Sequence, residues 1–186
     1  MTASRGRPRA SSREILADAA CELFLERGYE EASVTEIARR AGVSRSSFFN
    51  YFASKSDVVW HVFDERISAL TSALADRGTP LPQALRAFAA GEQPDTLALA
   101  VVESRTMGVE AELGAGRAER QWCISEAIAG RLRRDGVDEL RAEIVAAGYA
   151  AGLVGTVWRW ANRGAGRYPL DKMLIDAIAA VEKLLS

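Results

Sequence analysis

The stretch from Ser33 to Phe52, SVTEIARRAGVSRSSFFNYF, limits the possible folds of this chain more than any other. Ser33 followed three residues later by Glu36 is the signature of a capping box, which satisfies two backbone donors and marks where a helix begins. Gly42 can adopt a left-handed backbone and end that helix, and Ser44 can cap a second helix directly afterwards. A helix, a turn that contains glycine and a second short helix form the pattern of a helix-turn-helix motif, which reads DNA.

The second helix of the motif is expected to divide its side chains between the protein core and the DNA. A recognition helix contacts base edges with its N-terminal residues, so Arg45, Ser46 and Ser47 are the expected readers. We place Ser44, which caps this helix, in the same DNA-contacting group. Helical spacing puts on the inward side Phe48, Tyr51 and Phe52, and it leaves on the outer side Phe49 and Asn50.

Charge is distributed unevenly along the chain, although the net charge is only −1. Residues 1–13 and residues 37–56 both carry arginines and contain no acidic residue. Two basic segments beside the same motif indicate contact with phosphates, and the alternative for either segment is a set of solvated surface charges. Arg5 and Arg7 could lie in a minor groove, whose negative potential attracts arginine, or could belong to a flexible tail.

The chain is predicted to be all-α, with three parts. Residues 1–12 are polar and are expected to form a disordered basic arm. Residues 13–57 form the DNA-binding domain, and residues 58–186 form a helical effector-binding and dimerisation domain. A long helix from Ser54 to Arg77, on the order of 30 Å in length, would connect the two. Further helices are expected over 12–27, 81–90, 95–112, 116–134, 138–163 and 170–185, with breaks at Gly91, Gly114–Gly116, Gly136 and Gly164–Gly166.

Two helix faces near the C-terminus indicate self-association. The helix predicted over 138–163 carries a stripe of small residues, and glycine weakens a helix unless another backbone packs closely against it. The last helix has a broad apolar stripe. We expect the dimer interface to contain Ala147, Gly148, Ala151, Gly152, Gly155, Leu174, Ile178, Val181 and Leu185, because a dimer can read two half-sites. The alternative is that both faces belong to the core of one chain.

No motif marks a ligand site in the second domain, but several large side chains could line one cavity. Such a pocket is mostly apolar, with a few polar groups. The candidates are His61, Phe63, Phe88, Met107, Trp122, Tyr149 and Trp158. For each of them ordinary core packing is the alternative. Arg105, Arg117 and Arg120 could receive an anionic ligand, but arginines on exposed helix faces need no such role.

Other classes of function find little support in the sequence. Cys21 and Cys123 are far apart in a spacing that does not suit a metal site, so we expect two reduced thiols in a cytoplasmic protein. No apolar run approaches the ~18–20 residues that span a bilayer. One histidine, with no paired-carboxylate, nucleophile or metal signature, argues against an enzyme. We therefore expect no cofactor, no metal and no membrane partner.

Residues 13–60 resemble the DNA-binding domain of the TetR family of transcriptional repressors. The resemblance lies in Leu23-Phe24 with Gly28-Tyr29, in Ser33 to Ala38, in Ala41 to Ser44, in Phe48 to Phe52 and in Ser54-Lys55. It implies a three-helix DNA-binding head, a connecting fourth helix and a larger helical ligand domain. Members of the family are homodimers that bind palindromic operators and release them when a small molecule enters the ligand domain.

The resemblance also implies roles for individual residues. Arg45, Ser46 and Ser47 would approach bases or nearby phosphates. Phosphate would be contacted at the starts of two helices by Ser33, Thr35 and Lys55.

The chain departs from the family pattern at Phe49, where tyrosine is usual. A phenyl ring cannot donate a hydrogen bond to phosphate, so that contact is in doubt here. Asn50 could supply a replacement donor, and Tyr51 would pack inward or touch the DNA backbone.

The run from Phe48 to Lys55 is similar to that of actinobacterial members of the family, including regulators beside mycofactocin genes, some of which answer acyl-CoA esters. We therefore expect a ligand-responsive repressor that binds a palindromic operator in double-stranded DNA as a homodimer. A small-molecule effector, largely apolar, would release it. An architectural or nucleoid-binding DNA protein without an effector is the alternative.

Overall fold

The computed structural model describes residues 12–185, which fold into ten helices and contain no strand. The all-α prediction is therefore confirmed for this part of the chain. The elements are α1 (Ser12–Arg27), α2 (Val34–Arg40), α3 (Arg45–Phe49), α4 (Lys55–Ala75), α5 (Leu81–Ala89), α6 (Asp95–Val102), α7 (Ser104–Met107), α8 (Glu110–Arg134), α9 (Glu139–Gly164) and α10 (Leu170–Leu185). The predicted contacts of Arg5 and Arg7 lie outside the described residues, and the side chain of Leu185 is likewise not described.

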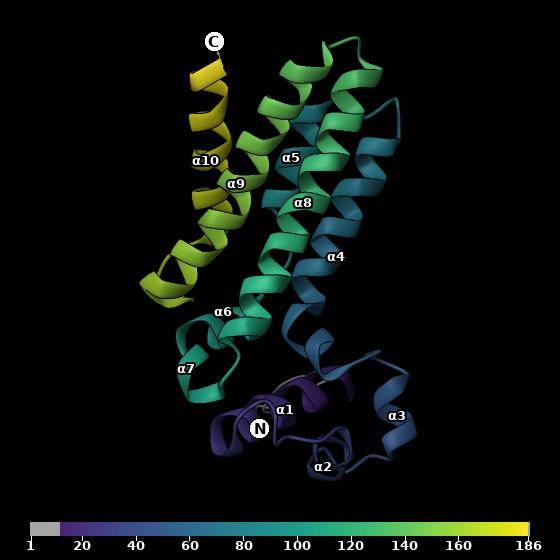
Figure 1. Cartoon of the computed structure of the whole chain (residues 1–186), viewed down its shortest axis with the longest axis vertical. Helices are drawn as coiled ribbons and strands as arrows, with labels where there is room; N and C mark the ends of the chain where they lie inside the picture. Colours follow the sequence, from purple (N-terminus) through teal and green to yellow (C-terminus); the bar gives the residue numbers. More distant parts are fainter. Residues whose placement is uncertain (1–11, 186) are drawn as a thin grey trace, which may run out of the picture.

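Figure 1 shows a small group of helices, α1 to α3, at one end of an elongated molecule. α4 leaves this group and runs beside α8 into the larger part, where α8, α9 and α10 lie side by side with α5 and α6 behind them. The short helix α7 packs against α1. We call α1–α3 the head and α4–α10 the body, which meet through α4 and again at α7.

Three serines set the starts of the helices in and beside the head. The Ser33 hydroxyl accepts a hydrogen bond from the Glu36 backbone N–H at 3.2 Å, and the Glu36 carboxylate accepts one from the Ser33 N–H at 3.2 Å. This is the predicted capping box. Ser44 and Ser54 accept equivalent backbone hydrogen bonds at the starts of α3 and α4. The position of each of these helices is therefore fixed by a local sequence signal.

The recognition helix is shorter than its apolar spacing predicts. α3 ends at Phe49, and the Asn50 backbone N–H bonds back to carbonyls of the helix. Phe52 still reaches the core, whereas Tyr51, which we expected on the inward side, is 42% exposed. Residues 50 and 51 form a turn, so helical spacing no longer determines where their side chains lie.

The helix break predicted at Gly114–Gly116 is wrong. α8 runs through both glycines without interruption, and the chain turns earlier, at Gly108, whose backbone is left-handed with φ 66°. The helices expected over 95–112 and 116–134 are therefore replaced by α6, α7 and α8. Gly116 has a packing role instead, because a Cβ atom there would lie only 2.5 Å from Cζ2 of Trp60.

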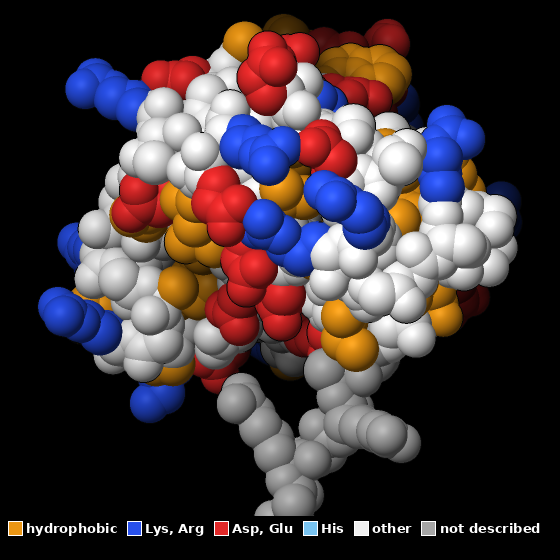
Figure 2. Space-filling model, turned by 90° about the horizontal axis from the view of Figure 1, so that it is seen from below, with side chains coloured by type: hydrophobic (Ala, Val, Ile, Leu, Met, Phe, Trp, Pro, Cys, Tyr) orange, Lys and Arg blue, Asp and Glu red, His pale blue; other side chains and the backbone are white. Residues whose placement is uncertain are grey.

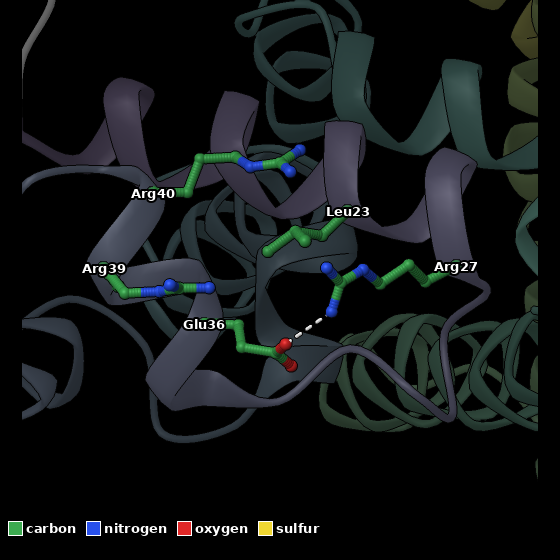
Figure 3. A pocket seen from close by; sticks show the side chains of 5 residues that line it. All are labelled: Leu23, Arg27, Glu36, Arg39 and Arg40. Carbon is green, nitrogen blue, oxygen red and sulfur yellow. Dashed lines mark hydrogen bonds and ion pairs between the residues drawn. The ribbon is translucent and has the colours of Figure 1, made fainter.

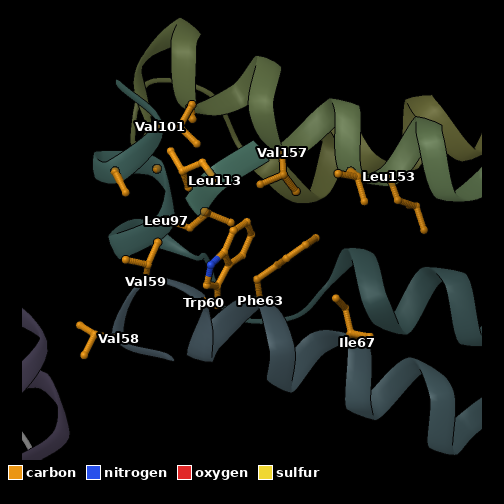
Figure 4. Packing of buried hydrophobic residues seen from close by; sticks show 14 of the residues in the cluster. Val58, Val59, Trp60, Phe63, Ile67, Leu97, Val101, Leu113, Leu153 and Val157 are labelled. Atoms are coloured by element: carbon orange, nitrogen blue, oxygen red, sulfur yellow. The ribbon is translucent and has the colours of Figure 1, made fainter. Parts of the chain in front are cut away.

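One continuous hydrophobic core extends through the head and the body. In the body, Trp60 and Phe63 of α4 pack among side chains of α6, α8 and α9 that include Leu97, Leu113 and Val157 (Figure 4). All five side chains are at most 5% exposed. The predicted domain boundary between residues 57 and 58 thus falls inside α4 and inside this core.

α9 corrects the expectation that no segment is long and apolar enough to cross a membrane. Among the described residues it is the one helix that meets this criterion by length and composition. Much of its apolar character comes from alanine and glycine, and it packs against α6, α8 and α10. A core helix can meet the same criterion, so α9 is weak support for a membrane span.

Candidate nucleic-acid interface

The start of α3 presents a compact group of polar side chains. The Ser44 hydroxyl accepts a hydrogen bond from the Ser47 backbone N–H at 3.1 Å and lies 2.8 Å from the hydroxyls of Ser46 and Ser47. The three hydroxyls therefore form one hydrogen-bonded group. Arg45 lies beside it, exposed, and within residues 12–185 no carboxylate is at ion-pair distance from its guanidinium.

Arg45 lies against the ring of Phe49, one helical turn further along α3. Its guanidinium carbon is 5.0 Å from the centroid of the Phe49 ring. Phe49 packs edge-on against Phe48, with ring centroids 5.4 Å apart. Phe48 is fully buried, whereas Phe49 is 45% exposed. The ring that cannot donate to phosphate therefore contacts the residue expected to read bases.

Lys55 is directed at the backbone of the head. Its Nζ donates to the Tyr29 carbonyl at 2.6 Å and to the Glu30 carbonyl at 3.3 Å, and lies 4.2 Å from the Tyr29 ring centroid. Lys55 thus ties the start of α4 to the loop between α1 and α2. An ammonium group has three N–H donors, so one donor is left for the predicted phosphate contact.

Acidic side chains neutralise part of the basic segment found in the sequence. Arg40 donates two hydrogen bonds to the Glu26 carboxylate, at 2.7 and 2.6 Å, and they hold the pKa of Glu26 below its ordinary value. Arg39 and Arg45 have no such partner in the described part of the chain. Figure 2 shows the outcome at the head end of the molecule, where basic and acidic side chains are interspersed.

A hollow of about 270 Å³ lies between α1 and α2 (Figure 3), lined by Leu23, Arg27, Glu36, Arg39 and Arg40. Glu36 pairs with Arg27 at 2.6 Å, and hydrogen bonds from Ser33 lower the pKa of the Glu36 carboxyl. Of the three arginines, Arg39 alone lacks an ion pair among the described residues. Arg39, which sequence reasoning did not single out, is therefore the cation of α2 best able to meet a phosphate.

The other predicted contact residues of the head lie at its surface. Thr35 and Asn50 are exposed, at the start of α2 and at the end of α3. The Ser33 hydroxyl is also exposed, but it exchanges hydrogen bonds with Glu36. Thr35 is thus accessible for a phosphate, while Ser33 primarily stabilises the helix.

The head and the start of α4 are tied to the rest of the body by hydrogen bonds that no local pattern signals. The Tyr29 N–H donates to the Met107 carbonyl at 2.6 Å, and the Ser56 hydroxyl donates to the Glu112 carboxylate. Burial, with a smaller effect from Glu112, raises the pKa of the Tyr29 phenol to about 12. These bonds connect the end of α1 and the start of α4 with α7 and α8.

Four of the predicted ligand-pocket residues lie in the core of the body. Phe63 and Phe88 pack edge-on, with ring centroids 6.1 Å apart. Trp158 lies on Trp60 with centroids 5.9 Å apart, and Met107 is fully buried. These contacts are the core packing that was the alternative reading for each residue.

The three remaining pocket candidates lie apart from one another. His61 packs on the Phe52 ring beside the head, with centroids 5.3 Å apart, and Trp122 is 65% exposed on α8. Tyr149 borders a hollow of about 490 Å³ at the end of the body away from the head. The other residues that line this hollow are Leu81, Leu132, Gly136, Val137, Asp138, Arg141 and Val145. None of the other six candidates lines this hollow, and its remaining lining residues were not among the candidates.

Some of the predicted dimer residues join α9 to α10 within one chain. Leu174 and Ile178 are buried. Val181 packs on Gly148 and Gly152, where a Cβ atom would lie 3.5 and 3.4 Å from its methyl carbons. Both distances are ordinary van der Waals contacts, so the packing of α10 on α9 leaves room for a methyl group at these two glycines.

Three other predicted dimer residues, Ala147, Ala151 and Gly155, lie on an outer stripe of α9 together with Leu140 and Ile144, which were not predicted. We define the outer stripe as Leu140, Ile144, Ala147, Ala151 and Gly155, which recur at helical spacing. Leu140 and Ile144 are 65% and 59% exposed, and the two alanines are also exposed. The stripe is apolar along its whole length.

Comparison with known proteins agrees with this arrangement. The profile of the bacterial regulatory proteins of the tetR family matches residues 16–62, which cover most of the head and the first part of α4. MftR of Mycobacterium tuberculosis, named for mycofactocin biosynthesis, is 38% identical over 44% of this chain and 42% of its own length. That match spans less than half of either protein. The transcriptional activator FasR of Mycolicibacterium smegmatis is 28% identical over 89% of this chain and 78% of its own length.

A solved structure shares the whole fold. The crystal structure of a TetR-family regulator from Mesorhizobium loti aligns with a TM-score of 0.56 at 20% identity, and the alignment covers 94% of this chain and 95% of that one. At this identity the likeness concerns the fold alone. The profile match therefore identifies the head as a DNA-binding domain of the TetR family of bacterial regulatory proteins, and the chain as a whole shares its fold with a TetR-family regulator.

Proposed function

We propose that this protein is a ligand-responsive repressor that acts in the cytoplasm as a homodimer. Two copies of α3 bind a palindromic operator, and a small, largely apolar molecule in the body releases the DNA. The observation that carries the proposal is α4, which starts at a cap in the head and contributes to the core of the body. A change in the body that moves α4 therefore also moves the recognition helix.

Base reading is assigned to the start of α3. Arg45 is exposed and free of carboxylates in the described chain, and arginine recognises guanine by two hydrogen bonds to O6 and N7. Ser46 and Ser47 lie beside it, and their hydroxyls are within hydrogen-bond distance of the Ser44 hydroxyl. Arg39, Thr35 and Lys55 are assigned to phosphates, which set affinity without selecting sequence.

Dimerisation is assigned to the outer stripe of α9. An apolar stripe of this kind suits a two-fold interface, in which the same surface of each protomer meets its copy. A dimer places its recognition helices on half-sites about 34–36 Å apart, one turn of DNA. Ala151→Glu, in the middle of the stripe, should yield monomers by size-exclusion chromatography with light scattering, and an unchanged dimer would refute this assignment.

Effector binding is assigned to the body. The hollow beside Tyr149 has a volume of about 490 Å³ and a mostly apolar lining, which suits a small apolar ligand. Release of DNA needs a coupling free energy between the two sites, typically about 1–3 kcal/mol. The Tyr29–Met107 and Ser56–Glu112 hydrogen bonds and α4 provide the physical connection for it.

The DNA-reading assignment can be tested by measuring binding to a duplex selected from random DNA by the wild-type protein. Arg45→Ala should relax base preference at one position per half-site. Arg39→Ala and Lys55→Ala should weaken binding to all sequences alike and reduce the salt dependence. Base preference that survives Arg45→Ala would show that Arg45 is not the reader.

The alternative is an architectural DNA-binding protein with no effector. It predicts binding that is indifferent to sequence and a thermal midpoint that no small molecule shifts. Because the relative FasR is named as an activator, an experiment must also distinguish repression from activation. A reporter gene behind the selected operator should be silenced by the protein, and activation would refute repression while leaving DNA recognition intact.

A further inference from the structure

We propose that Phe49 is a positioning residue for Arg45, and that its ring helps to determine which base α3 prefers. The inference rests on the proposed function, in which Arg45 reads a base. It deepens that function by assigning a role to a side chain that has no hydrogen-bonding group of its own.

The contact between the two side chains is local to α3. Arg45 and Phe49 are four residues apart, so they lie on the same face of the helix. Side chains in a helix lean toward its N-terminus, which brings the Phe49 ring over the turn that carries Arg45. The guanidinium carbon lies 5.0 Å from the ring centroid, within the range of a cation–π contact.

The position of the Phe49 ring is set by the core of the head. Phe49 packs edge-on against Phe48, with centroids 5.4 Å apart and an interplanar angle of 82°. Phe48 is fully buried and packs in turn on Phe52, at 5.5 Å between centroids. A series of three aromatic rings thus leads from the core to Arg45, and Phe49 is the exposed end of it.

Arg45 has no competing polar partner in the described part of the chain. The neighbouring Ser44 hydroxyl is engaged with Ser46 and Ser47, and the arginines that are neutralised by carboxylates lie elsewhere in the head. The Phe49 ring is therefore the contact that restrains the Arg45 side chain before DNA is bound. A restrained side chain loses less conformational freedom when it binds.

The chemistry of the contact leaves the reading function available. A ring covers a face of a guanidinium, while the N–H donors of that group lie in its plane and stay free for O6 and N7 of guanine. A cation–π contact at an exposed site corresponds to about a two- to fivefold change in an equilibrium constant. Phe49 should therefore influence specific binding modestly and nonspecific binding hardly at all.

The experiment uses the full-length protein and a duplex selected from random DNA by the wild type. Binding is measured at fixed salt by fluorescence anisotropy, for this duplex and for copies changed at each base of one half-site. Phe49→Leu should weaken binding to the selected duplex by about two- to fivefold and reduce discrimination at the base that Arg45 recognises. Phe49→Tyr, which keeps the ring, should retain wild-type discrimination at that base.

A double-mutant cycle separates positioning from direct contact. If Phe49 acts through Arg45, Phe49→Leu should have no further effect in an Arg45→Ala background. An equal effect in both backgrounds would mean that the ring touches DNA itself and would overturn the proposal. Phe49→Leu with wild-type affinity and base preference would overturn it as well.

A control addresses loss of structure at the surface of the head. Ile15→Ala removes another large apolar side chain that is exposed on the head, without removing a contact to Arg45. It should not change discrimination at the Arg45 base, and an effect equal to that of Phe49→Leu would count against positioning. Failure of the proposed function is distinguishable, because wild-type protein would then select no sequence at all, or Arg45→Ala would leave base preference intact.

Discussion

Gly116→Ala should not bring the stability that alanine usually adds over glycine in the interior of a long helix. A Cβ atom at this position would lie 2.5 Å from Cζ2 and 2.7 Å from Cε2 of Trp60. The indole cannot easily retreat, because it is fully buried and the Arg120 guanidinium lies 3.9 Å from its centroid. Arg120 is itself held by two hydrogen bonds to Asp64, at 2.6 and 2.7 Å.

Two effects of opposite sign decide the stability of Gly116→Ala. Alanine favours a helix over glycine by about 1 kcal/mol, whereas overpacking of a core costs about 1–3 kcal/mol. Gly114 provides a matched control in the same helix, since a Cβ atom there meets nothing within 4 Å. Gly114→Ala should therefore be stabilising, and Gly116→Ala should be less stable than Gly114→Ala by about 1–3 kcal/mol.

The measurement is urea unfolding followed by circular dichroism at one protein concentration, because association would shift the apparent stability. Each glycine is replaced both in the wild type and in a Trp60→Leu background. Removal of the indole should abolish most of the difference between the two positions. Equal stabilisation by both alanines in the wild type would refute the reasoning, because it would mean that the ring does not limit the space at Gly116.

Three further predictions concern other single residues. Lys55→Met should lower the unfolding free energy by about 1 kcal/mol, because it removes the hydrogen bonds to the Tyr29 and Glu30 carbonyls; Lys172→Met, at an exposed position of α10, should not. Burial raises the pKa of the Cys21 thiol from 9.0 to about 12, so its contribution to stability is complete below pH 9 and is lost as the pH rises toward 12. Between pH 8 and pH 10 the wild type should lose about 1.4 kcal/mol relative to Cys21→Ala, and parallel pH profiles would contradict this. At pH 8 a thiol reagent should modify Cys123, which is partly exposed, well before the buried Cys21; rapid modification of Cys21 in native protein would be inconsistent with its burial.

Patterns among residues close together in the sequence were sufficient to predict the helix-turn-helix. The capping box at Ser33 and the serine cap at Ser44 involve residues three apart, so they could be recognised without knowledge of the fold. The same holds for the apolar faces that identify the helices of the body. The all-α architecture and the position of the recognition helix followed from these local patterns.

Packing between distant segments set the rest, because it brings together residues that no spacing relates. The glycines at 114 and 116 predicted a break in the helix, but Gly116 is helical. It packs against Trp60, 56 positions away along the chain. The Lys55 ammonium group donates a hydrogen bond to the Tyr29 carbonyl, so this N–H is not available for the phosphate contact that was predicted from the sequence. The division of the small residues of α9 between the contact with α10 and the outer stripe likewise depended on where α10 came to lie, and a helical period alone cannot specify that.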